Sequence, residues 1–331
     1  MIISPNFWYK KNFFSKLTGY FFFPVSLLWI AVSIIKKIVI KPYTTKLKVF
    51  CIGNLTVGGT GKTPFTIYVY KLLKSLGYNP VFLTRGYGGT SKLPIVVEPF
   101  HEPYLVGDEA ILLSKIGTTV VSKNRAKGAQ FIEKFIKKFD VILMDDGLQN
   151  YQLRQDLKIL LVDKKNTFGN NLCLPAGPLR EPVKSGLKKI DLIVLTGDRQ
   201  NKSQVMFEKY KHIPIFESKL KLHKNNNDKN YNYLAFCALA NPKKFFNTLV
   251  ENKYKVSKRI MFPDHHAYTN KDIDNIINQA RTHNLKIITT EKDFVKIKKN
   301  KSGIDYLSIE MNLSIKDKYI FKKLIESKLN E

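Results

Sequence analysis

A glycine-rich stretch at residues 56–63, TVGGTGKT, holds the residue types that bind phosphate groups. Glycines let successive backbone N–H groups converge on an anion and permit positive φ angles. A helix that begins there adds unpaired N–H groups and the positive end of its dipole. The Lys62 ammonium would reach the β- and γ-phosphates of a nucleotide, and the Thr63 hydroxyl would bind Mg²⁺. The candidate cofactor-binding residues are Thr56, Gly58, Gly59, Thr60, Gly61, Lys62 and Thr63.

The segments around this stretch have the layout that such a loop requires. An apolar run, Leu47 to Ile52, precedes it and predicts a buried strand, and apolar residues at helical spacing follow it. Strand, glycine-rich turn, Lys-Thr and helix together form a phosphate-binding loop. The general pattern has glycine where this chain has Thr56, so the stretch by itself leaves an ordinary glycine-rich turn as the alternative.

Two adjacent aspartates, Asp145 and Asp146, end an apolar run that begins at Val141. A buried strand that ends in a carboxylate beside a phosphate loop can hold Mg²⁺ directly or through water. A strand followed by an Asp-Gly turn is the alternative. The combination with residues 56–63 favours the magnesium interpretation.

Two further polar clusters could supply an acid or a base. A Gly-Asp-Glu run places Asp108 at the start of a predicted helix, where spacing alone favours a capping or dipole-complementing residue over a catalytic base. An Asp-His-His run at 264–266 lies between a predicted strand and a predicted helix. Adjacent histidines point in different directions and are poor joint metal ligands, but one of them beside an aspartate can tune an acid or a base. A polar loop without chemistry is the alternative for this run.

The composition predicts a globular protein with a large basic excess. The chain has 331 residues, 44% of them hydrophobic and 12% aromatic, which is enough for two domains and argues against disorder. A net charge of +28 is compatible with nucleic acid or an anionic membrane as partner. Lysine is abundant even in plain loops, and no RNA-binding aromatic motif, zinc finger or evident helix-turn-helix is present, so we expect no nucleic-acid partner. Three widely spaced cysteines favour a reducing compartment over disulfides or zinc.

The first fifty residues contain no acidic residue and include an apolar stretch, Leu17 to Ile35, between two groups of lysines. A signal peptide has a similar composition, but the phosphate loop that follows almost at once needs cytosolic nucleotide. The stretch is barely long enough to span a bilayer, and Gly19 and Pro24 interrupt it. Dense aromatic residues and flanking lysines favour an interfacial helix at an anionic membrane surface. A spanning helix and a buried first helix are the alternatives.

The order of the predicted elements indicates an α/β fold class. Strands and helices alternate from about residue 47 to residue 195, which predicts a P-loop-like, mostly parallel sheet with helices on both faces. A polar stretch at 223–232 predicts a linker, and the strand–helix pattern then restarts. We therefore expect a membrane-associated helical segment at 1–45, a nucleotide-binding domain at 46–222, and a smaller α/β domain at 233–331 that completes the active-site cleft.

Seven short motifs follow one another along the chain. They are GNLTVGGTGKTP at 53–64, TRGYG at 84–88, GDE at 107–109, DDGLQ at 145–149, LPAGPLREP at 174–182, DHH at 264–266 and TEKDFVK at 290–296. In this order they resemble the tetraacyldisaccharide 4′-kinase family, the lipid A 4′-kinases of Gram-negative bacteria. The resemblance covers nearly the whole chain, and Thr56 is usual within it. Position 150 departs from it, because Asn150 stands where histidine is expected.

The resemblance implies a kinase that uses ATP and Mg²⁺ to phosphorylate the 4′-hydroxyl of a tetraacylated glucosamine disaccharide 1-phosphate, the lipid A disaccharide precursor. It places this reaction at the cytoplasmic face of the inner membrane, without an obligate protein partner. It implies that Asp108 is the catalytic base, that His265 pairs with it across an interdomain cleft, and that Lys62 is catalytic. The implied metal ligands are Thr63, Asp145, Asp146 and Glu181, and the implied groups for substrate phosphate or transition-state charge are Arg85, Arg125 and Arg180.

Two other classes of protein remain open on the sequence. A phosphate-loop ATPase or GTPase switch would hydrolyse nucleotide without a lipid acceptor, although no Asn-Lys-x-Asp guanine-binding motif is evident. A noncatalytic module that binds membrane or nucleic acid has only the net charge in its favour.

Overall fold

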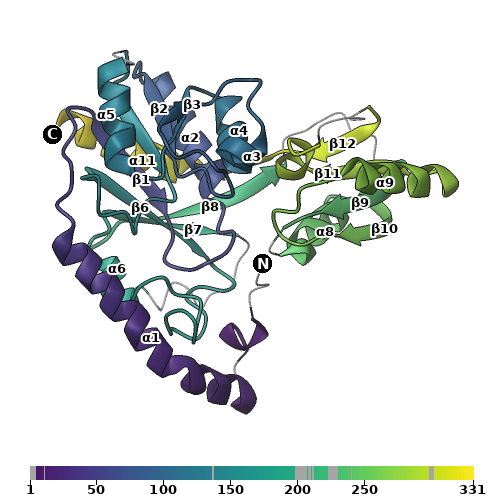
Figure 1. Cartoon of the computed structure of the whole chain (residues 1–331), viewed down its shortest axis with the longest axis horizontal. Coiled ribbons are helices and arrows are strands. Elements are labelled where there is room, and N and C mark those ends of the chain that lie inside the picture. Colours follow the sequence, from purple (N-terminus) through teal and green to yellow (C-terminus); the bar gives the residue numbers. More distant parts are fainter. Residues whose placement is uncertain are drawn as a thin grey trace.

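The chain is arranged around two β-sheets, and the long helix α1 (Phe13–Val39) runs along the outside of the larger one (Figure 1). This computed structural model describes residues 5–10, 12–135, 138–197, 207, 210, 212–222, 230–239, 241–297 and 302–331. The linker predicted at 223–232 lies largely outside the described residues, which include only its last three positions.

The larger sheet is mostly parallel. Its described strands are β1 (Lys48–Gly53), β2 (Pro80–Thr84), β3 (Ile95–Val96), β4 (Thr119–Val121), β5 (Val141–Asp145), β6 (Leu157–Asp163), β7 (Leu192–Thr196), β8 (Ile215–Leu222) and β13 (Ile309–Leu313). They lie in the order β13-β8-β7-β6-β1-β5-β2-β4-β3. The neighbouring strands are parallel except at the two edges, where β13 pairs antiparallel with β8 and β3 with β4. The predicted α/β fold class is therefore confirmed.

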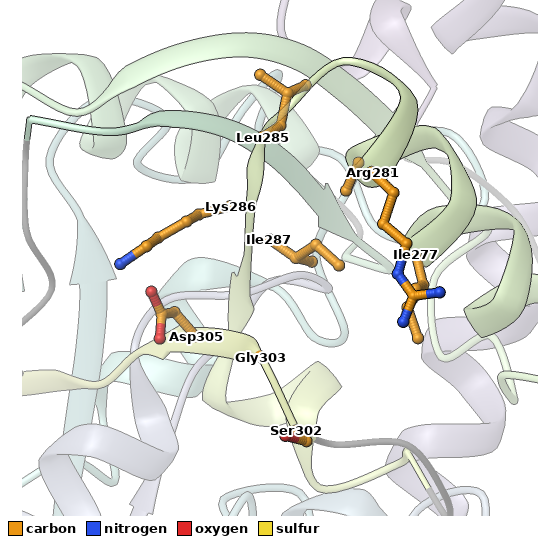
Figure 2. A pocket seen from close by; sticks show the side chains of 9 residues that line it. Ile277, Arg281, Leu285, Lys286, Ile287, Ser302, Gly303 and Asp305 are labelled. Carbon is orange, nitrogen blue, oxygen red and sulfur yellow. The ribbon is translucent and has the colours of Figure 1, made fainter.

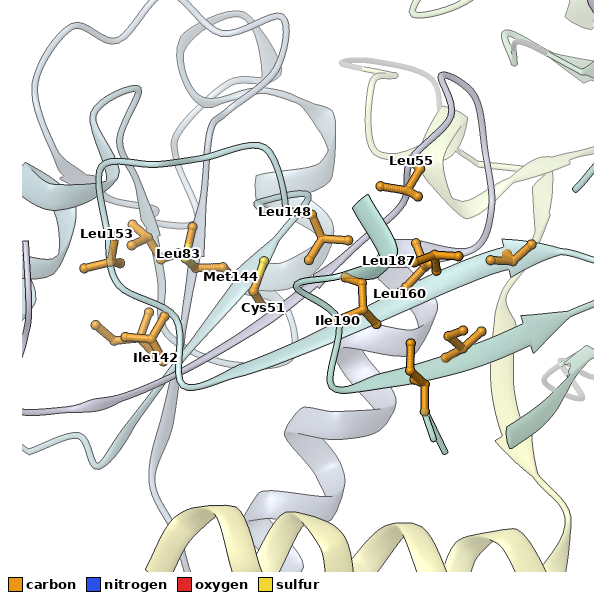
Figure 3. Packing of buried hydrophobic residues seen from close by; sticks show 14 of the residues in the cluster. Cys51, Leu55, Leu83, Ile142, Met144, Leu148, Leu153, Leu160, Leu187 and Ile190 are labelled. Carbon is orange, nitrogen blue, oxygen red and sulfur yellow. The ribbon is translucent and has the colours of Figure 1, made fainter. Parts of the chain in front are cut away.

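Strand β1 lies in the interior of this sheet and is buried on both faces. Side chains alternate between the two faces of a strand, so Val49 and Cys51 pack into one core cluster while Phe50 and Ile52 pack into the other. Figure 3 shows the first cluster, in which Cys51 lies near Met144 and leucines of neighbouring segments. A doubly covered strand requires the unbroken apolar run that precedes the glycine-rich stretch.

Helices supply the covering side chains on each face. On one face, α2 (Lys62–Ser75) and α11 (Ile315–Asn330) contribute Phe65 and Phe321, whose rings meet edge to face with centroids 5.8 Å apart. On the other face, α5 (Arg125–Phe135) and the short α6 (Val183–Leu187) contribute Ile132 and Leu187. Two further short helices, α3 (Pro103–Val106) and α4 (Asp108–Ser114), precede β4. Burial of this apolar surface, at roughly 25 cal/mol per Å², holds β1 and α2 in place on either side of the glycine-rich loop.

The smaller sheet is parallel throughout its described strands. These are β9 (Asn232–Cys237), β10 (Lys255–Met261), β11 (Lys286–Thr290) and β12 (Ile304–Leu307), in the order β10-β9-β11-β12. Its helices are α8 (Pro242–Glu251), α9 (Asn270–Thr282) and the four-residue α10 (Glu291–Phe294). Phe236 packs in one cluster with Ile273 of α9, and Cys237 packs in another with Phe245 of α8, so these helices cover opposite faces.

The C-terminal segment differs from the sequence-based boundary at 233–331. After β12 the chain returns to the larger sheet, where β13 pairs antiparallel with β8 and α11 buries Phe321 and Ile325 completely. The smaller α/β unit therefore ends near Leu307. Antiparallel pairing at a sheet edge joins residues far apart in the chain, which no local pattern in the sequence signals.

Helix α1 exposes most of its apolar side chains. Phe21 is 77% exposed and Leu28 69% exposed. The residues that α1 buries are Ser15, Gly19 and Ser26. The Ser26 hydroxyl donates to a backbone carbonyl of the loop before Arg180 at 2.8 Å, and Trp29 Nε1 donates to the Arg180 carbonyl at 2.8 Å. Within the described ranges, α1 is the one helix long and apolar enough to cross a membrane. It docks by a face of small residues on the loop that carries Arg180.

Candidate active site

The glycine-rich stretch forms a loop between β1 and α2. Gly58 and Gly61 have φ angles of 111° and 85°, a region that residues with side chains rarely adopt. Gly61 is also the N-cap of α2, so the unpaired N–H groups of the first helical turn face the loop. A Cβ built at Gly58 or Gly59 would meet nothing within 4 Å. The loop therefore borders open space beside Gly58 and Gly59, on the side where Cβ atoms would lie.

The register of the sheet brings Thr63 against Asp145. Strands β1 and β5 are parallel, and Asp145 pairs with Ile52 near the end of β1, so its carboxylate lies at the edge from which the glycine-rich loop leaves. The Thr63 hydroxyl donates to Asp145 Oδ2 at 3.0 Å, and the Thr66 hydroxyl donates to Oδ1 at 3.2 Å. The two halves of the predicted magnesium motif are therefore in contact.

Asp146 faces two cations. Arg180 donates from both Nη atoms to its carboxylate at 2.7 and 3.0 Å. The Lys62 ammonium lies 3.7 Å from Asp146 Oδ2 and 3.5 Å from the carbonyl oxygen of Gly58. Burial opposes ionisation of Asp146, but the charges of Lys62 and Arg180 outweigh it and lower the pKa to about 2. The charge on this carboxylate is already compensated.

The pKa of the neighbouring Asp145 is shifted in the opposite direction, upward. It is 1% exposed and forms no ion pair within the part of the chain that the structure describes. Burial raises the pKa of Asp145 to about 7, and the carboxylates of Glu109 and Asp146 act in the same direction. Lys62 and the hydrogen bond from Thr63 offset this only in part. Because this pKa is close to neutral pH, the side chain is only partly ionised there, and a bound cation would stabilise its charged form.

The proline-rich loop at 174–182 lies against the glycine-rich loop. Thr56 forms an antiparallel bridge with Leu179, and the Val57 N–H donates to the Pro178 carbonyl at 2.9 Å. Thr56, which departs from the general phosphate-loop pattern, thus belongs to a short backbone pairing with this second loop. Because α1 docks on the same proline-rich loop, the exposed helix and the glycine-rich loop share one support.

Glu181 does not join the Thr63–Asp145 pair. Its Oε1 accepts from Gln149 Nε2 at 2.8 Å and from the Lys189 ammonium at 2.9 Å. Within the described residues, no hydrogen bond or ion pair links Glu181 to Asp145. The geometry therefore sets Glu181 apart from the other implied metal ligands.

The two remaining arginines have different surroundings. Arg125 is 2% exposed, and its Nη1 donates to the Ser122 carbonyl at 2.6 Å. Burial lowers the pKa of Arg125 to about 10, which leaves it charged near neutral pH. Arg85 is exposed, directly after β2. Asn150 holds its own turn, because its Oδ1 accepts from the Gln152 N–H at 3.1 Å, and Gln152 Oε1 accepts from the Arg125 N–H at 3.2 Å.

Asp108 and His265 meet although they lie 157 residues apart. His265 Nδ1 lies 3.0 Å from Asp108 Oδ2. Gly107 is the N-cap residue of α4 and Asp108 is the first helical residue, so Asp108 does not cap the helix but lies in its first turn, where its charge complements the helix dipole. His265 has a φ of 58°, and its ring lies 5.1 Å from the ring of Tyr87 in the glycine-rich loop after β2. A loop of the smaller sheet thus brings its histidine to a helix of the larger unit.

Two charged residues at this contact had no role in the sequence-based expectations. The Lys292 ammonium donates to Glu109 Oε1 at 3.2 Å and lies 3.4 Å from His265 Nε2. Their only signal in the sequence was membership of the motifs at 107–109 and 290–296. Burial opposes ionisation of Glu109, but the charges of Lys292 and Lys62 outweigh it and lower its pKa. Because Glu109 also acts on Asp145, it connects the two parts of the site electrostatically.

A cavity of about 340 Å³ opens elsewhere, on the smaller sheet (Figure 2). Residues of α9, β11 and β12 line it, and Figure 2 shows Lys286 and Asp305 on one side and Arg281 on the other. None of the predicted site residues belongs to its lining. The candidate active site is therefore the edge of the sheet where the loops after β1 and β5 meet α4 and the loop of His265.

Comparisons with known proteins match the chain over almost its whole length. The family model described as tetraacyldisaccharide-1-P 4′-kinase (LpxK) matches residues 19–330. A relative from Rickettsia typhi, named tetraacyldisaccharide 4′-kinase, is 36% identical over 325 residues, which cover 97% of this chain and 99% of the relative. A relative of the same name from Rickettsia akari is 34% identical over 325 residues, with 97% and 98% covered.

One solved structure is similar as well. It is described as the "apo" form of LpxK from Aquifex aeolicus in complex with ATP, and it has a TM-score of 0.75 and 28% identity. The similarity covers 94% of this chain and 99% of that one. Since the family model and the curated relatives both extend over the glycine-rich loop and over the distant segment that carries His265, the chain belongs to the tetraacyldisaccharide-1-phosphate 4′-kinase family.

Proposed function

We propose that this protein transfers the γ-phosphoryl group of ATP to the 4′-hydroxyl of a tetraacylated glucosamine disaccharide 1-phosphate. The observation that carries the proposal is the contact of Asp108 with His265, at 3.0 Å, beside a phosphate loop. A nucleotide site alone suffices for hydrolysis or switching, whereas an added acid–base pair suits an acceptor hydroxyl. The names of the relatives and the ATP complex of the similar structure support the same reaction.

The glycine-rich loop would bind the triphosphate. The open space beside Gly58 and Gly59 leaves room for phosphates next to the loop, whose backbone N–H groups would bind them. Within the part of the chain that the structure describes, the polar contacts of the Lys62 ammonium are with the Gly58 carbonyl at 3.5 Å and with Asp146 at 3.7 Å. Both contacts are long, so the ammonium can exchange them for a phosphate oxygen at little cost.

The donor set around Asp145 fits Mg²⁺. Thr63 and Asp145 present a hydroxyl and a carboxylate oxygen 3.0 Å apart, and such oxygens are the ligands that this ion prefers. No group of three His, Cys, Asp or Glu side chains converges among the residues described. This agrees with an ion that is held by one or two carboxylates and completed by phosphate oxygens and water. When bound, Mg²⁺ would neutralise charge on the β- and γ-phosphates.

The other two implied metal ligands, Asp146 and Glu181, are already paired with cations of the protein. Asp146 is bound bidentately by Arg180, and Glu181 is bound by Lys189. Each of these carboxylates would have to give up a cation in order to reach a metal ion. We therefore assign Thr63 and Asp145 as the ligands and Asp146 as the group that holds Arg180 in place.

Asp108 would accept the proton of the 4′-hydroxyl. A sugar hydroxyl is a poor nucleophile near neutral pH, so its proton must leave as the new phosphorus–oxygen bond forms. His265 occupies Oδ2, while Oδ1 makes no hydrogen bond within the described part of the chain. The free oxygen is the atom that would take the proton, and His265 would hold the carboxylate in the orientation that this transfer needs.

The arginines would balance the charge that develops on the transferred group. Arg180 is oriented in advance by its two hydrogen bonds to Asp146, which leaves little entropy to lose on substrate binding. Arg85 is exposed and could contact a phosphate directly. Arg125 is buried against the Ser122 carbonyl, so it would act through its charge at a distance rather than by contact.

We also propose that the two α/β units close over the substrates. Asp108 and Glu109 come from the larger unit, while His265 and Lys292 come from the smaller one. Approach of the smaller unit would therefore assemble the base and exclude water, which protects ATP from hydrolysis.

A direct test is to incubate the purified full chain in detergent with ATP, Mg²⁺ and the disaccharide 1-phosphate and to follow the lipid by mass spectrometry. We expect a product heavier by one phosphate group, with fragmentation placing it on the 4′ position. Exposed Lys271, replaced by Met, serves as the control variant and should form product at the normal rate. Consumption of ATP that does not depend on the lipid, without a phosphorylated product, would contradict the kinase and favour a hydrolytic switch.

Helix α1 would hold the enzyme at the cytoplasmic surface of the inner membrane. Its exposed face is apolar, with Phe21 and Leu28 mostly exposed, while the opposite face docks through Ser26 and Trp29. Lipid cannot surround a helix that is docked along one side, so we favour partial immersion over a spanning helix. Lysines flanking the apolar stretch would meet anionic headgroups at ~1 kcal/mol each. The docked helix keeps the active site next to the bilayer in which the acyl chains remain.

Flotation with vesicles of anionic phospholipid tests this helix. The double variant Phe21→Glu/Leu28→Glu should lose vesicle binding, because it places two charges on the immersed face. The matched control is Phe100→Glu/Ile315→Glu, whose residues are 78% and 90% exposed outside α1. If the α1 variant still floats with the vesicles, or if the control is released equally, another surface binds the membrane.

A further inference from the structure

The contact between the two units contains a lysine, Lys292, that lies beside His265. Lys292 lies in α10, and its ammonium is 3.2 Å from Glu109 Oε1 and 3.4 Å from His265 Nε2. The other ring nitrogen, Nδ1, is 3.0 Å from Asp108 Oδ2. His265 therefore has the Asp108 carboxylate at Nδ1, while the group nearest to Nε2 is the Lys292 ammonium, with the Asp264 carboxylate farther away at 4.0 Å.

Lys292 keeps its charge in this environment. Burial opposes the charged form, but the carboxylates of Glu109 and Asp108 outweigh it and raise the pKa of Lys292. An ammonium group has three donors and no acceptor. Nε2 can therefore interact favourably with Lys292 only as an acceptor, because an N–H at Nε2 would face an N–H of the ammonium.

Ala238, the residue directly after β9, anchors both partners. The Ala238 carbonyl accepts from the His265 N–H at 3.3 Å, and the Ala238 N–H donates to Asp293 Oδ2 at 3.1 Å. Asp293 belongs to α10 and is further held by Thr290, whose hydroxyl donates to Oδ2 at 2.7 Å. The loop of His265 and the helix of Lys292 are thus both hydrogen-bonded to the backbone of Ala238. These bonds hold the two side chains at a fixed distance from each other.

We propose that Lys292 is a positioning residue that holds His265 as the neutral Nδ1–H tautomer, so that this histidine donates a hydrogen bond to Asp108 and does not take up the substrate proton. Nδ1 already carries its proton and Nε2 is occupied by Lys292, so neither nitrogen is open to a proton from Asp108. The role of Asp108 as base rests on the proposed function, whereas the tautomer of His265 does not.

Removal of Lys292 would change the charge state of the histidine. The groups that face His265 from the packed elements are Asp108 of α4, the Tyr87 ring, and Asp264, whose Oδ1 is 4.0 Å from Nε2. Without the lysine, the charged neighbours that remain are the carboxylates of Asp108 and Asp264, which favour an imidazolium. A charged His265 would reduce the basicity of Asp108 and so slow proton transfer.

Nitrogen NMR of the full chain labelled with ¹⁵N-histidine tests this directly. The chain has six histidines, and the signals of His265 are identified by their loss in His265→Gln. Near neutral pH we expect one protonated nitrogen coupled as Nδ1 and one unprotonated Nε2. In Lys292→Met both nitrogens should become protonated, in Lys292→Arg, which retains a donor, Nε2 should stay unprotonated, and in the exposed control Lys271→Met nothing should change.

An Nε2–H tautomer or an imidazolium in the unaltered protein would overturn the proposal, as would a Lys292→Met spectrum identical to that of the unaltered protein. If Lys292→Met fails to fold, the spectra of the unaltered protein and of Lys292→Arg still decide the question. In kinetics, Lys292→Met should lower kcat roughly 10–100-fold, the size usual for a partner that orients a reactive group, with KM for ATP unchanged. Absence of any kinase activity in the unaltered protein would refute the proposed function and leave the NMR result standing.

Discussion

The two parts of the active site are built in different ways. The phosphate side consists of Lys62 and Thr63, which begin helix α2, and of Asp145, which ends strand β5 next to the parallel strand β1. The acceptor side consists of Asp108, which precedes β4 of the larger sheet, and His265, which follows β10 of the smaller one. Strand register positions the first group, and the contact between two separate units positions the second.

This difference indicates which substitutions should disturb each part of the site. Sheet register changes only if core strands slip, and these strands are buried on both faces. The acceptor side depends on a few polar contacts between units, such as His265 with Asp108 and Lys292 with Glu109. We therefore expect substitutions on the acceptor side to affect transfer alone and substitutions on the phosphate side to affect nucleotide binding as well.

The largest effect is expected for Asp108→Asn. An amide cannot accept the hydroxyl proton, so kcat should fall by roughly 10²–10⁴-fold, the contribution of a general base. ATP affinity should stay unchanged, because Asp108 lies outside the glycine-rich loop. Steady-state kinetics and calorimetric titration with ATP measure the two quantities. Near-normal turnover would remove Asp108 from the role of base, and weakened ATP binding would erase the separation between the two sides.

Lys62→Met should have the next largest effect. Loss of the ammonium removes charge stabilisation from the phosphates, and we expect kcat to fall by roughly 10²–10³-fold. In contrast to Asp108→Asn, the Kd for ATP should also rise. If Lys62→Met lost turnover but bound ATP normally, substitutions on the phosphate side would affect transfer alone, as expected for the acceptor side, and the contrast between the two sides would fail.

Gly61→Ala tests how the late segment β13 supports the glycine-rich loop. Gly61 has a φ of 85°, and a Cβ there would collide with the side chain of Met311. We expect destabilisation by roughly 1–2 kcal/mol from the backbone angle, and more from the collision. Gly77→Ala is the matched control, since Gly77 has a φ of 88° and a Cβ there would meet nothing within 4 Å. Equal losses of Tm in the two variants would show that Met311 yields freely.

The smallest effect concerns Mg²⁺ and pH at Asp145. Burial raises the pKa of Asp145 from 3.8 to about 7. The folded state therefore binds more protons than the unfolded chain between these values, and stability falls as pH rises through that window. Because Mg²⁺ competes with this proton, its affinity should drop roughly tenfold per pH unit below the pKa of about 7.

Thermal unfolding with and without Mg²⁺, as a function of pH, measures this competition. The gain in Tm from Mg²⁺ should be larger above pH 7 than below it, and Asp145→Asn should remove the gain. A gain in Tm that is independent of pH would mean that the metal binds elsewhere. Lys271→Met serves as the control, because Lys271 is an exposed residue of α9 in the smaller unit and should leave the gain in Tm and its pH dependence unchanged.

Several elements of the site follow directly from local sequence patterns. The buried strand before Gly58, the helix after Thr63 and the strand that ends at Asp145 were all predicted from apolar periodicity. A strand buried on both faces has an unbroken run of apolar residues, whereas a helix buried on one face has apolar residues every three or four positions. Each pattern can be recognised within a short stretch of the sequence. Two such segments with a phosphate loop and a carboxylate were sufficient to predict a nucleotide site.

Other features had no local pattern. Asp108 has the spacing of a capping residue, and its pairing with His265 came from the family resemblance. The sequence assigned no role to Lys292 and Glu109, whose contact is seen only in the structure. The return of β13 and α11 to the larger sheet was not predicted either. In each case the partners are far apart in the chain, and the contact forms between side chains without periodic spacing.

The sequence by itself determined the fold class, the phosphate loop and the family, because these depend on short stretches whose backbone geometry demands particular residues such as Gly58, Gly61 and Asp145. Only the tertiary structure decided that Arg180 holds Asp146, that burial raises the pKa of Asp145, and that Lys292 faces Nε2 of His265. The physical reason is that the charge state of a buried group depends on the distances to all other charges, and those distances exist only after the chain has folded.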